Sequence, residues 1–438
     1  MPDRLTARIL TRAVDPEALF LALHSEADDI FWLDAGASAV DGWSYVGTGE
    51  PSAVPRGVRI DVGSTTAAAT PPLHSGWVGW LDYESGARAA GAPTAESGSE
   101  PHEAGLRITR MAAFDHSTGR VWAMAHESGL DDWAACVTSM TSEGAMHVVP
   151  PAPSRTAVAR DTPGEYAALI ERCRELIRAG TAYQLCLTTR FSVPGDHDAV
   201  AAYRRLRSAT PAHHGGFLRI GDVALLSASP EQFLHSESGR ISTRPIKGTR
   251  PRGRDAADDA ALAAELAADP KERAENVMIV DLMRNDLSRV CEPGSIRVDA
   301  LWAVETYPAV HQLVSTVSGR AAQGTTFGDL LAAAFPAGSM TGAPKLSAMT
   351  ELSALEGGPR GIYSGCFGYV GDDGAIDLAM VIRSIVLDGH GARVGAGGGI
   401  TWRSIASAEV AEVATKATAP LAALGAEMPV AWASDILN

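Results

Sequence analysis

The chain has 438 residues, enough for two or three folded units of ordinary size. Lys and Arg total 37 against 52 Asp and Glu, a formal net charge of −15, which argues against a protein that binds the phosphate backbone of nucleic acids. Hydrophobic residues make up 46% of the chain and charged residues 20%, typical of a folded globular protein, and no run approaches the ~18 apolar residues of a membrane span.

The cysteines argue against both a disulfide framework and a structural zinc site. There are five, an odd number, widely spread and without a C-x-x-C pair. The N-terminal stretch has no long apolar block and predicts no signal peptide. Together these features favour a cytoplasmic protein.

Short apolar runs separated by Gly, Pro and Ser fill the first part of the chain. FWLDAG, WSYVGTG and GWVGWLDYE predict strands and turns. The Pro-rich stretch VVPPAPSRTAVARDTPGEY predicts a linker, so we expect an N-terminal subdomain at residues 1–150 and a second domain at residues 160–425.

The second part mixes helices with strands. TPGEYAALIERCRELIRAG predicts a capped helix, AYQLCLTTRFSV a strand, and the stretch from Asp222 to Thr249 a hairpin whose tight turn lies near Ser238–Gly239. A long helix is expected from Asp269–Pro270 to Asn285, then Gly-rich strands and a last helix from about Ser407. This order predicts an α+β fold rather than a regular βαβ ladder.

Three apparent ligand motifs fail on spacing. GAGGGI places Ile400 where a dinucleotide loop has its third glycine, and GSMTGAPK does not match a phosphate loop. SGCFG misses the G-x-C-x-G pattern by one residue, so the sequence shows no cysteine nucleophile of a glutaminase.

The last helix carries acidic residues at the edge of an apolar face. Glu409, Glu412 and Lys416 are spaced i, i+3 and i+7 and share one side of the helix. Two like charges on adjacent turns repel unless a cation lies between them. On this helix alone, a solvated face is the simpler interpretation.

A second helix supplies a further carboxylate. Glu275 shares its face with the apolar Met278, Ile279 and Leu282, and Glu272 lies one turn earlier. An ionised carboxylate on an apolar face is costly unless it is paired or binds a metal. Carboxylates from two helices suit a hard cation, so we expect Mg²⁺.

The predicted hairpin pairs an acid with an amine. Residue numbers 231 and 247 average to the position of the turn, so Glu231 and Lys247 are expected to face each other within one register step. Such a pair can act as proton donor and nucleophile. An ordinary cross-strand salt bridge explains it equally well.

Six motifs in this order resemble the chorismate-utilising enzymes: SPEQF, RPIKGTRPRG, KERAEN-x-MIVDLMRND, FPAGSMTGAPK, GIYSGCFGY and AGGGI. That family comprises component I of anthranilate synthase and of aminodeoxychorismate synthase, isochorismate synthase and salicylate synthase. The resemblance implies antiparallel sheets packed as a sandwich flanked by helices, with Mg²⁺ and chorismate in a cleft.

Site residues are carried over from these motifs. The resemblance assigns Glu275, Glu409 and Glu412 to Mg²⁺ and Arg383 to the enolpyruvyl carboxylate of chorismate. It assigns these further residues to substrate binding: Gln184, Thr249, Tyr363, Gly397, Gly398, Gly399 and Lys416. It also implies partner docking, and a tryptophan-type pocket that includes Ser25, in the N-terminal subdomain.

Two positions distinguish the members of the family. Water-using members have a lysine where this chain has Gln184, and an amide is too weak a base to activate water. Lys247, in PIKGT, resembles the aminodeoxychorismate-forming members, whereas anthranilate synthases have alanine. We therefore expect Lys247 to attack ring carbon 2 while Glu231 protonates the leaving hydroxyl. A lysine nucleophile must be neutral, so its pKa is expected to fall.

The resemblance thus predicts a Mg²⁺-dependent aminating transferase that makes 4-amino-4-deoxychorismate for 4-aminobenzoate synthesis, with ammonia from a glutamine amidotransferase partner. Anthranilate synthase component I and a catalytically silent paralogue stay as alternatives. Several members have a histidine before L-V-S, where this chain has Gln312, with His311 one residue earlier. In anthranilate synthases that histidine is linked to loss of pyruvate, so its absence weakens the anthranilate alternative.

Overall fold

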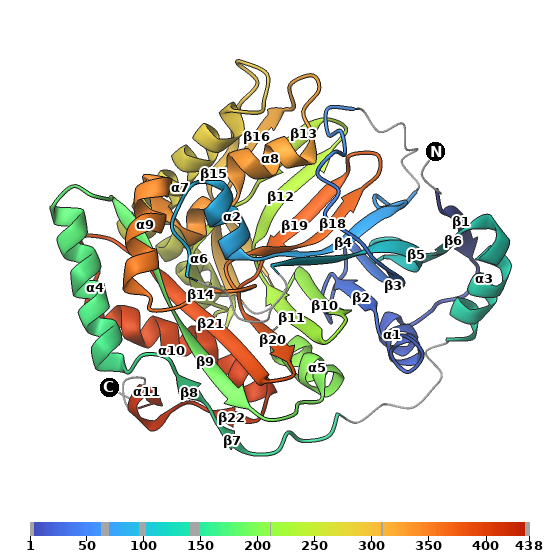
Figure 1. Ribbon diagram of the computed structural model, residues 1–438, viewed down its shortest axis with the longest axis horizontal. Helices are drawn as coiled ribbons and strands as arrows, with labels where there is room; N and C mark the ends of the chain where they lie inside the picture. The colour runs from blue at the N-terminus through green and yellow to red at the C-terminus, as the bar shows by residue number, and fades with distance from the viewer. Residues whose placement is uncertain are drawn as a thin grey trace.

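The computed structural model describes residues 4–62, 70–95, 102–140, 149–210, 212–307 and 310–433. Within these ranges twenty strands join into one hydrogen-bonded system, and a two-stranded sheet stands apart (Figure 1). The helices are α1 (Pro16–His24), α2 (Tyr83–Ala89), α3 (Leu130–Ser139), α4 (Pro163–Arg178), α5 (Ala199–Ala209), α6 (Ala256–Ala268), α7 (Pro270–Ser288), α8 (Phe327–Ala334), α9 (Lys345–Leu355), α10 (Ala406–Ala423) and α11 (Val430–Ala433).

The strands form two antiparallel sheets that share one long strand. The first sheet has β1 (Thr6–Leu10), β6 (Arg120–Ala125), β5 (Glu103–Asp115), β3 (Trp43–Pro51), β2 (Ile30–Asp34), β10 (His214–Ile220), β11 (Val223–Ser229), β20 (Ser384–Asp388), β21 (Gly391–Ile400) and β9 (Gln184–Pro194), with β8 (Val158–Ala159) and β17 (Gly342–Ala343) also on β9.

The second sheet starts again from β5. It continues through β4 (Gly76–Leu81), β18 (Cys366–Gly371), β19 (Ile376–Met380), β12 (Gln232–Glu237), β13 (Arg240–Thr243) and β16 (Val310–Arg320), which also pairs with β14 (Ile246–Pro251) and β15 (Arg297–Thr306). The separate parallel pair is β7 (Arg155–Thr156) with β22 (Ala426–Glu427).

Three apolar layers explain this arrangement. One buried cluster draws side chains from both sheets, such as Phe31 of the first and Tyr369 of the second, and fills the space between them. A second cluster covers the outer face of the first sheet beneath α1, α4, α5 and α10, and a third covers the second sheet beneath α7 and α8. The predicted α+β class, a sandwich of antiparallel sheets flanked by helices, is confirmed.

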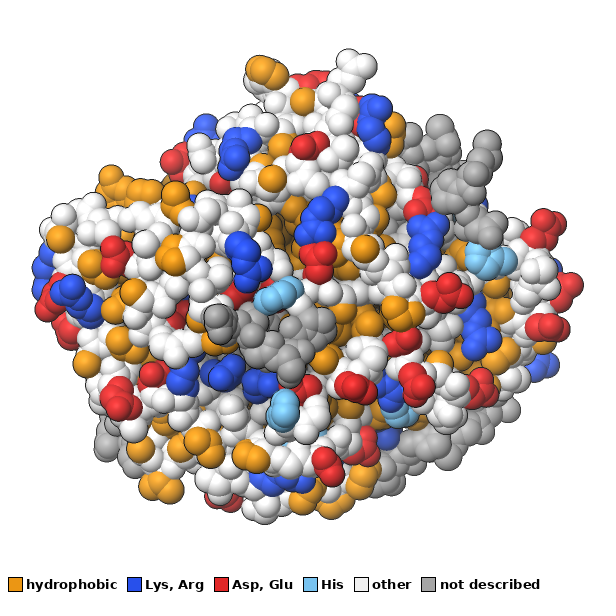
Figure 2. Space-filling view, viewed as in Figure 1, with side chains coloured by type: hydrophobic (Ala, Val, Ile, Leu, Met, Phe, Trp, Pro, Cys, Tyr) orange, Lys and Arg blue, Asp and Glu red, His pale blue; other side chains and the backbone are white. Residues whose placement is uncertain are grey.

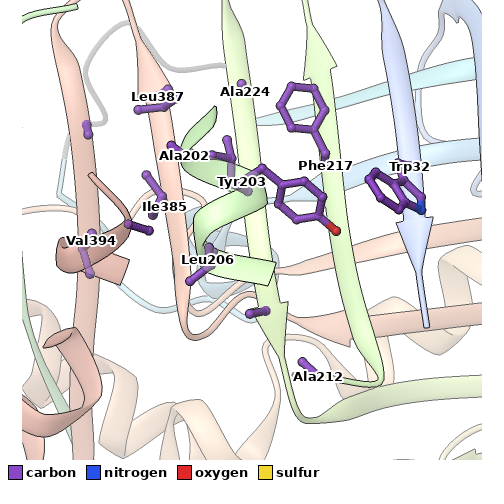
Figure 3. Close-up of a cluster of buried hydrophobic side chains, with 14 of the residues drawn as sticks. Trp32, Ala202, Tyr203, Leu206, Ala212, Phe217, Ala224, Ile385, Leu387 and Val394 are labelled. Carbon is purple, nitrogen blue, oxygen red and sulfur yellow. The ribbon is translucent and has the colours of Figure 1, made fainter. Parts of the chain in front are cut away.

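Aromatic packing beneath α5 shows how the outer layer is built. The rings of Trp32, Tyr203 and Phe217 come from β2, α5 and β10 and lie together in Figure 3. The Trp32 and Tyr203 centroids are 5.5 Å apart in an edge-to-face arrangement, which aromatic pairs favour. All three side chains are buried, so this layer holds α5 on the sheet.

The two predicted domains share both sheets. Strand β2 pairs with β10, and β4 pairs with β18, so strands from residues 1–150 alternate with strands from residues 160–425. The boundary between the domains stays a prediction. No helix in the described ranges is long and apolar enough to cross a membrane.

Local sequence signals placed the main elements correctly. Thr162 and Glu165 form the reciprocal cap at the start of α4, and Asp269 accepts hydrogen bonds from two backbone N–H groups at the start of α7. The turn between β12 and β13 lies at Ser238 and Gly239, whose φ angles of 51° and 77° are those of a tight hairpin. All five cysteines are free thiols.

Acidic and basic side chains are mixed over the face of the molecule seen in Figure 2. The formal net charge of −15 disfavours a phosphate-backbone ligand.

Candidate active site

Gln184 and the glycine run meet where β9 pairs with β21. The Gln184 side chain is fully buried, and neither its amide oxygen nor its nitrogen has a hydrogen-bond partner among the described residues. A Cβ atom on Gly399 would lie 2.6 Å from the Gln184 amide nitrogen, and one on Gly398 would lie 3.2 Å from a carboxylate oxygen of Glu409. The glycines therefore keep space beside a polar group that still needs a partner, as a ligand site requires.

Glu231 and Lys247 come together, but not as a cross-strand pair. The hairpin turn is where the sequence predicts it, yet β13 ends at Thr243 and β14 pairs with β16 instead of β12. The predicted direct pairing of Glu231 with Lys247 is therefore wrong, because the chain changes partner strand before it reaches Lys247. Each residue nevertheless alters the pKa of the other, and no ion pair within 4.0 Å joins them in the described chain.

The carboxyl group of Glu231 is poised to hold a proton near neutral pH. It is 7% exposed, and burial raises its pKa from 4.5 to about 7. The charges of Lys247 and Lys416 and a hydrogen bond with the Ser339 side chain act in the opposite direction without cancelling this effect. Such a group can donate a proton at physiological pH.

Lys247 behaves differently from the expectation. Burial lowers its pKa, but the neighbouring side chains of Glu275, Cys186, Glu231 and Glu412 raise it, and the net direction is upward. The predicted fall in pKa is wrong for the arrangement shown, because acidic side chains surround the amine. Two of these side chains, Glu275 and Glu412, are predicted metal ligands, so Lys247 lies near the predicted metal site.

The carboxylates of α7 and α10 converge on a lysine. The ammonium nitrogen of Lys271 lies 3.8 Å from Oε1 of Glu275 and 3.9 Å from Oε1 of Glu409. Glu412, on the next turn of α10, pairs with Lys416 at 2.7 Å. No group of three His, Cys, Asp or Glu side chains in the described ranges already forms a metal site. Glu275 and Glu409 are thus brought together by the ammonium group of Lys271, and the described carboxylates do not yet form a complete set of metal ligands.

This donor set fits a divalent cation. Burial raises the pKa of Glu275 and Glu409, and each is raised further by a neighbouring carboxylate. Oε1 of Glu275 is buried without a hydrogen-bond partner among the residues described. Carboxylate oxygens on two helices are the ligands that Mg²⁺ prefers, and Lys271 stands where such positive charge is needed.

Arg383 and Tyr363 form another wall of the site. Burial lowers the pKa of Arg383, and the neighbouring Tyr363 and Glu412 act in the opposite direction without reversing this shift, so Arg383 lies near both. No carboxylate of the described chain is within ion-pair distance of its guanidinium. Its φ of 51° lies in the left-handed region, which is costly for a residue with a side chain and occurs often at ligand sites.

Two further predicted residues differ in their contacts. Nζ of Lys416 donates to the Gly397 carbonyl at 2.8 Å, which ties α10 to the glycine run. Thr249 is exposed on β14, opposite Gln312, and no contact draws its side chain to the other predicted site residues.

His311 is engaged away from Glu231 and Lys247. Its Nδ1 lies 2.9 Å from the Thr306 hydroxyl and its Nε2 lies 2.9 Å from Oδ1 of Asp259, so the ring fastens α6 to the sheet. Gln312, its neighbour, is buried between Thr249 and Glu305 in the ladder.

Sequence reasoning gave no role to Ser339, Cys186 or Lys271. Ser339 bonds to Glu231, Cys186 is a buried neighbour of Lys247, and Lys271 bridges the two helices. Ser339 lies within the quoted motif FPAGSMTGAPK, and Cys186 is two residues from Gln184 on the same strand face. These two positions in the sequence could have indicated that Ser339 and Cys186 lie at the site.

Comparisons with known proteins match almost the whole chain. The model of the family described as chorismate binding enzyme matches residues 53–422. The chain is 39% identical to the aminodeoxychorismate synthase of Streptomyces pristinaespiralis, over 99% of this chain and 67% of that protein. It is 37% identical to the aminodeoxychorismate synthase of Streptomyces griseus, over 97% of this chain and 65% of that protein. The chain thus spans about two thirds of the length of these relatives.

A solved structure shares the fold. The crystal structure of anthranilate synthase component I from Streptococcus pneumoniae TIGR4 superimposes with a TM-score of 0.73 at 27% identity, and the match covers 96% of this chain and 92% of that one. The sandwich and the flanking helices are therefore those of a known enzyme architecture.

Proposed function

The chain belongs to the chorismate binding enzyme family, and from that premise we propose that it converts chorismate and ammonia into 4-amino-4-deoxychorismate. The observation that carries the proposal is the amine of the half-buried Lys247, which lies among acidic side chains and near the protonatable Glu231. Two relatives whose names state aminodeoxychorismate synthase activity, at 39% and 37% identity, support it.

The first half of the reaction forms a covalent intermediate. The amine of Lys247, whose pKa is raised by its acidic neighbours, first gives a proton to one of these carboxylates. As a neutral amine it then attacks ring carbon 2, the double bonds shift, and the bond from carbon 4 to its hydroxyl breaks. Glu231 gives its proton to that hydroxyl, which leaves as water.

The second half releases the lysine. Ammonia attacks carbon 4, the double bonds shift back, and the bond from carbon 2 to Lys247 breaks. The new ammonium group returns a proton to Glu231, so the net change is chorismate and ammonia to aminodeoxychorismate and water.

Two side chains favour this outcome over related ones. Gln184 stands where water-using relatives have a lysine, and an amide cannot take a proton from water at useful rates. His311 is held by Thr306 and Asp259, and Gln312 has no basic nitrogen, so neither supplies a base for the loss of pyruvate. The enolpyruvyl group is therefore retained.

Substrate and cation would share the acidic end of the site. We assign Mg²⁺ to Glu275, Glu409 and Glu412. Bound there, it would supply positive charge for a dicarboxylate substrate among acidic side chains. Arg383 is assigned to the enolpyruvyl carboxylate, and the backbone N–H groups of Gly397–Gly399 allow a close approach. Lys416 holds this glycine segment in place, and Tyr363, Gln184 and Thr249 complete the assigned set.

The N-terminal segment is assigned to partner docking. We propose that a glutamine amidotransferase partner supplies the ammonia. A cavity of about 520 Å³ between β2, β10, β12 and β19 is lined by Ile246 and Pro230 but not by Lys247 or Glu231, and we keep it as the candidate tryptophan-type pocket. Ser25, just after α1, does not line this cavity, and its assignment to a tryptophan-type pocket stays a prediction.

Product identification tests the proposed function. Protein with chorismate, Mg²⁺ and ammonium salt is expected to give a product that keeps the enolpyruvyl group, seen by mass. Anthranilate and free pyruvate would indicate the reaction in the name of the structural neighbour. No product with ammonia or with an added amidotransferase subunit would indicate a silent paralogue.

A further inference from the structure

A buried ion pair lies behind the site without an assigned role. Glu356, just after α9, and Arg360, four residues later, are 4% and 6% exposed, with Oε1 and Nη2 2.7 Å apart. The guanidinium also stacks over the ring of Tyr83, 4.1 Å from its centroid. Burial of two charges is costly, so their contacts need an explanation.

The guanidinium of Arg360 holds two segments of the active site by their carbonyl groups. Nη1 donates to Met340 O at 2.6 Å and Nη2 donates to Cys186 O at 2.8 Å. Met340 directly follows Ser339, whose side chain bonds to Glu231. Cys186 is two residues from Gln184, on the strand that forms the other side of the site.

The carboxylate of Glu356 fixes the same strand from the other direction. Its Oε1 accepts from the Thr188 N–H at 2.9 Å and from the Thr188 hydroxyl at 3.0 Å. Thr188 lies opposite Gly397 in the ladder between β9 and β21, so the contact sets the position of the glycine run. Glu356 and Arg360 therefore pair with each other and also bond to backbone groups in the walls of the site.

A second buried acid fixes the loop between Arg360 and Tyr363. Oε1 of Glu84 accepts from the Arg360 N–H at 2.7 Å, and Oε2 accepts from the Gly361 N–H at 2.9 Å. Glu84 is 3% exposed on α2, far along the chain from the catalytic motifs. The pair is thus anchored on its own backbone as well as on its neighbours.

We propose that Glu356 and Arg360 are positioning residues, which hold the Ser339 hydroxyl against Glu231 and hold Gln184 in register with the glycine run. The proposal rests on the proposed function, because it gives a purpose to the placement of Glu231 as proton donor. Lys247 from β14 and Lys416 from α10 are the charged groups that face Glu231, and neither contacts the pair.

A purely structural pair and a positioning pair predict different results. The hydrogen bond from Ser339 lowers the pKa of Glu231, so a loosened Ser339 raises it. The rate falls as Glu231 loses its proton, so the alkaline limb of the rate profile moves to higher pH. A purely structural pair would change stability but not this limb.

Arg360→Lys is the test, with Arg207→Lys as the matched control. Lysine keeps the positive charge but loses the planar fork that reaches two carbonyls and a carboxylate at once. Arg207 is also paired with a buried acid, Asp34, and also stacks on an aromatic ring, Trp32 at 4.7 Å, but lies in the α5 layer. Both variants are compared by melting temperature, by kcat and KM for chorismate, and by ¹³C NMR titration of Glu231.

We expect Arg360→Lys to lower kcat by about tenfold or more, with less change in KM, since small misplacements of reacting groups have large effects on rate. Glu231 should titrate at higher pH. Arg207→Lys should lower the melting temperature but leave kcat and the titration unchanged.

Three results would overturn the proposal: a normal kcat and titration in Arg360→Lys, equal losses of kcat in both variants, or a Ser339→Ala variant in which Glu231 titrates as in the wild type. The last variant leaves the buried pair intact, so it decides the matter even if Arg360→Lys does not fold. The titration needs no turnover, so it is informative even if the wild type makes no aminated product.

Discussion

Replacement of Glu231 by glutamine should lower kcat and raise the free energy of unfolding at alkaline pH. Glutamine keeps the shape and the contact with Ser339 but has no proton to give. A carboxyl with a pKa of about 7 is about half protonated at pH 7, against roughly 0.3% for a solvated glutamate. Burial thus enriches the donor form by about two orders of magnitude, and loss of a general acid lowers rates by about 10²–10⁴-fold. We expect kcat to fall within that range.

The same substitution has a calculable effect on folding. The pKa of Glu231 is raised in the folded state from 4.5 to about 7, so the folded protein binds the proton more tightly than the unfolded chain. Stability is therefore present at low pH and is lost as the pH rises from 4.5 to 7. The loss is about 1.4 kcal/mol per pKa unit, or about 3 kcal/mol in total.

Urea unfolding of both proteins at two pH values measures this effect. At pH 8 Glu231→Gln should be more stable than the wild type by about 3 kcal/mol, because it buries no charge, and at pH 5 most of the difference should vanish. An unchanged stability at pH 8, or an equal difference at both pH values, would refute the reasoning about the buried carboxyl.

Other parts of the site give predictions of the same kind. Gly399→Ala places a methyl group 2.6 Å from the Gln184 amide nitrogen, so KM for chorismate should rise about tenfold or more while the melting temperature changes little; an unchanged KM would show that Gln184 does not contact substrate. Added Mg²⁺ should raise the melting temperature of the wild type, more so at higher concentration, and should not raise that of Glu275→Gln. Equal increases in both proteins would show that the cation binds elsewhere. Asp259→Ala removes the acceptor of His311, so it should lower stability by about 1–3 kcal/mol yet leave the product unchanged; a new pyruvate product would give His311 a catalytic role.

Local order along the chain was predictable because it depends on neighbouring residues. The cap at Thr162, the turn at Ser238–Gly239 and the helix that starts at Pro270 each follow from a few adjacent side chains. The strand exchange after Thr243 was not predictable from the hairpin arithmetic. It depends on which strand lies beside Ile246, and that is β16, more than sixty residues further along the chain.

The site shows the same division. Motifs located Lys247, Glu231 and the three acidic residues, but the charges on Lys247 could be judged only when α7, α10 and β14 were placed together. Isolated motifs do not show how many acidic side chains surround an amine, so the direction of the Lys247 pKa was predicted wrongly. Glu356 and Arg360 were missed because their partners, Thr188, Cys186 and Met340, lie on separate segments.

Covalent attachment of the substrate to Lys247 is the central claim. The most direct measurement is intact-protein and peptide mass spectrometry of the protein mixed with chorismate and Mg²⁺ in the absence of ammonia. We predict an adduct with the mass of chorismate minus water on the peptide that contains Lys247, absent in Lys247→Ala and discharged when ammonia is added. Aminodeoxychorismate formation by Lys247→Ala at the wild-type rate, with no adduct on either protein, would contradict the account.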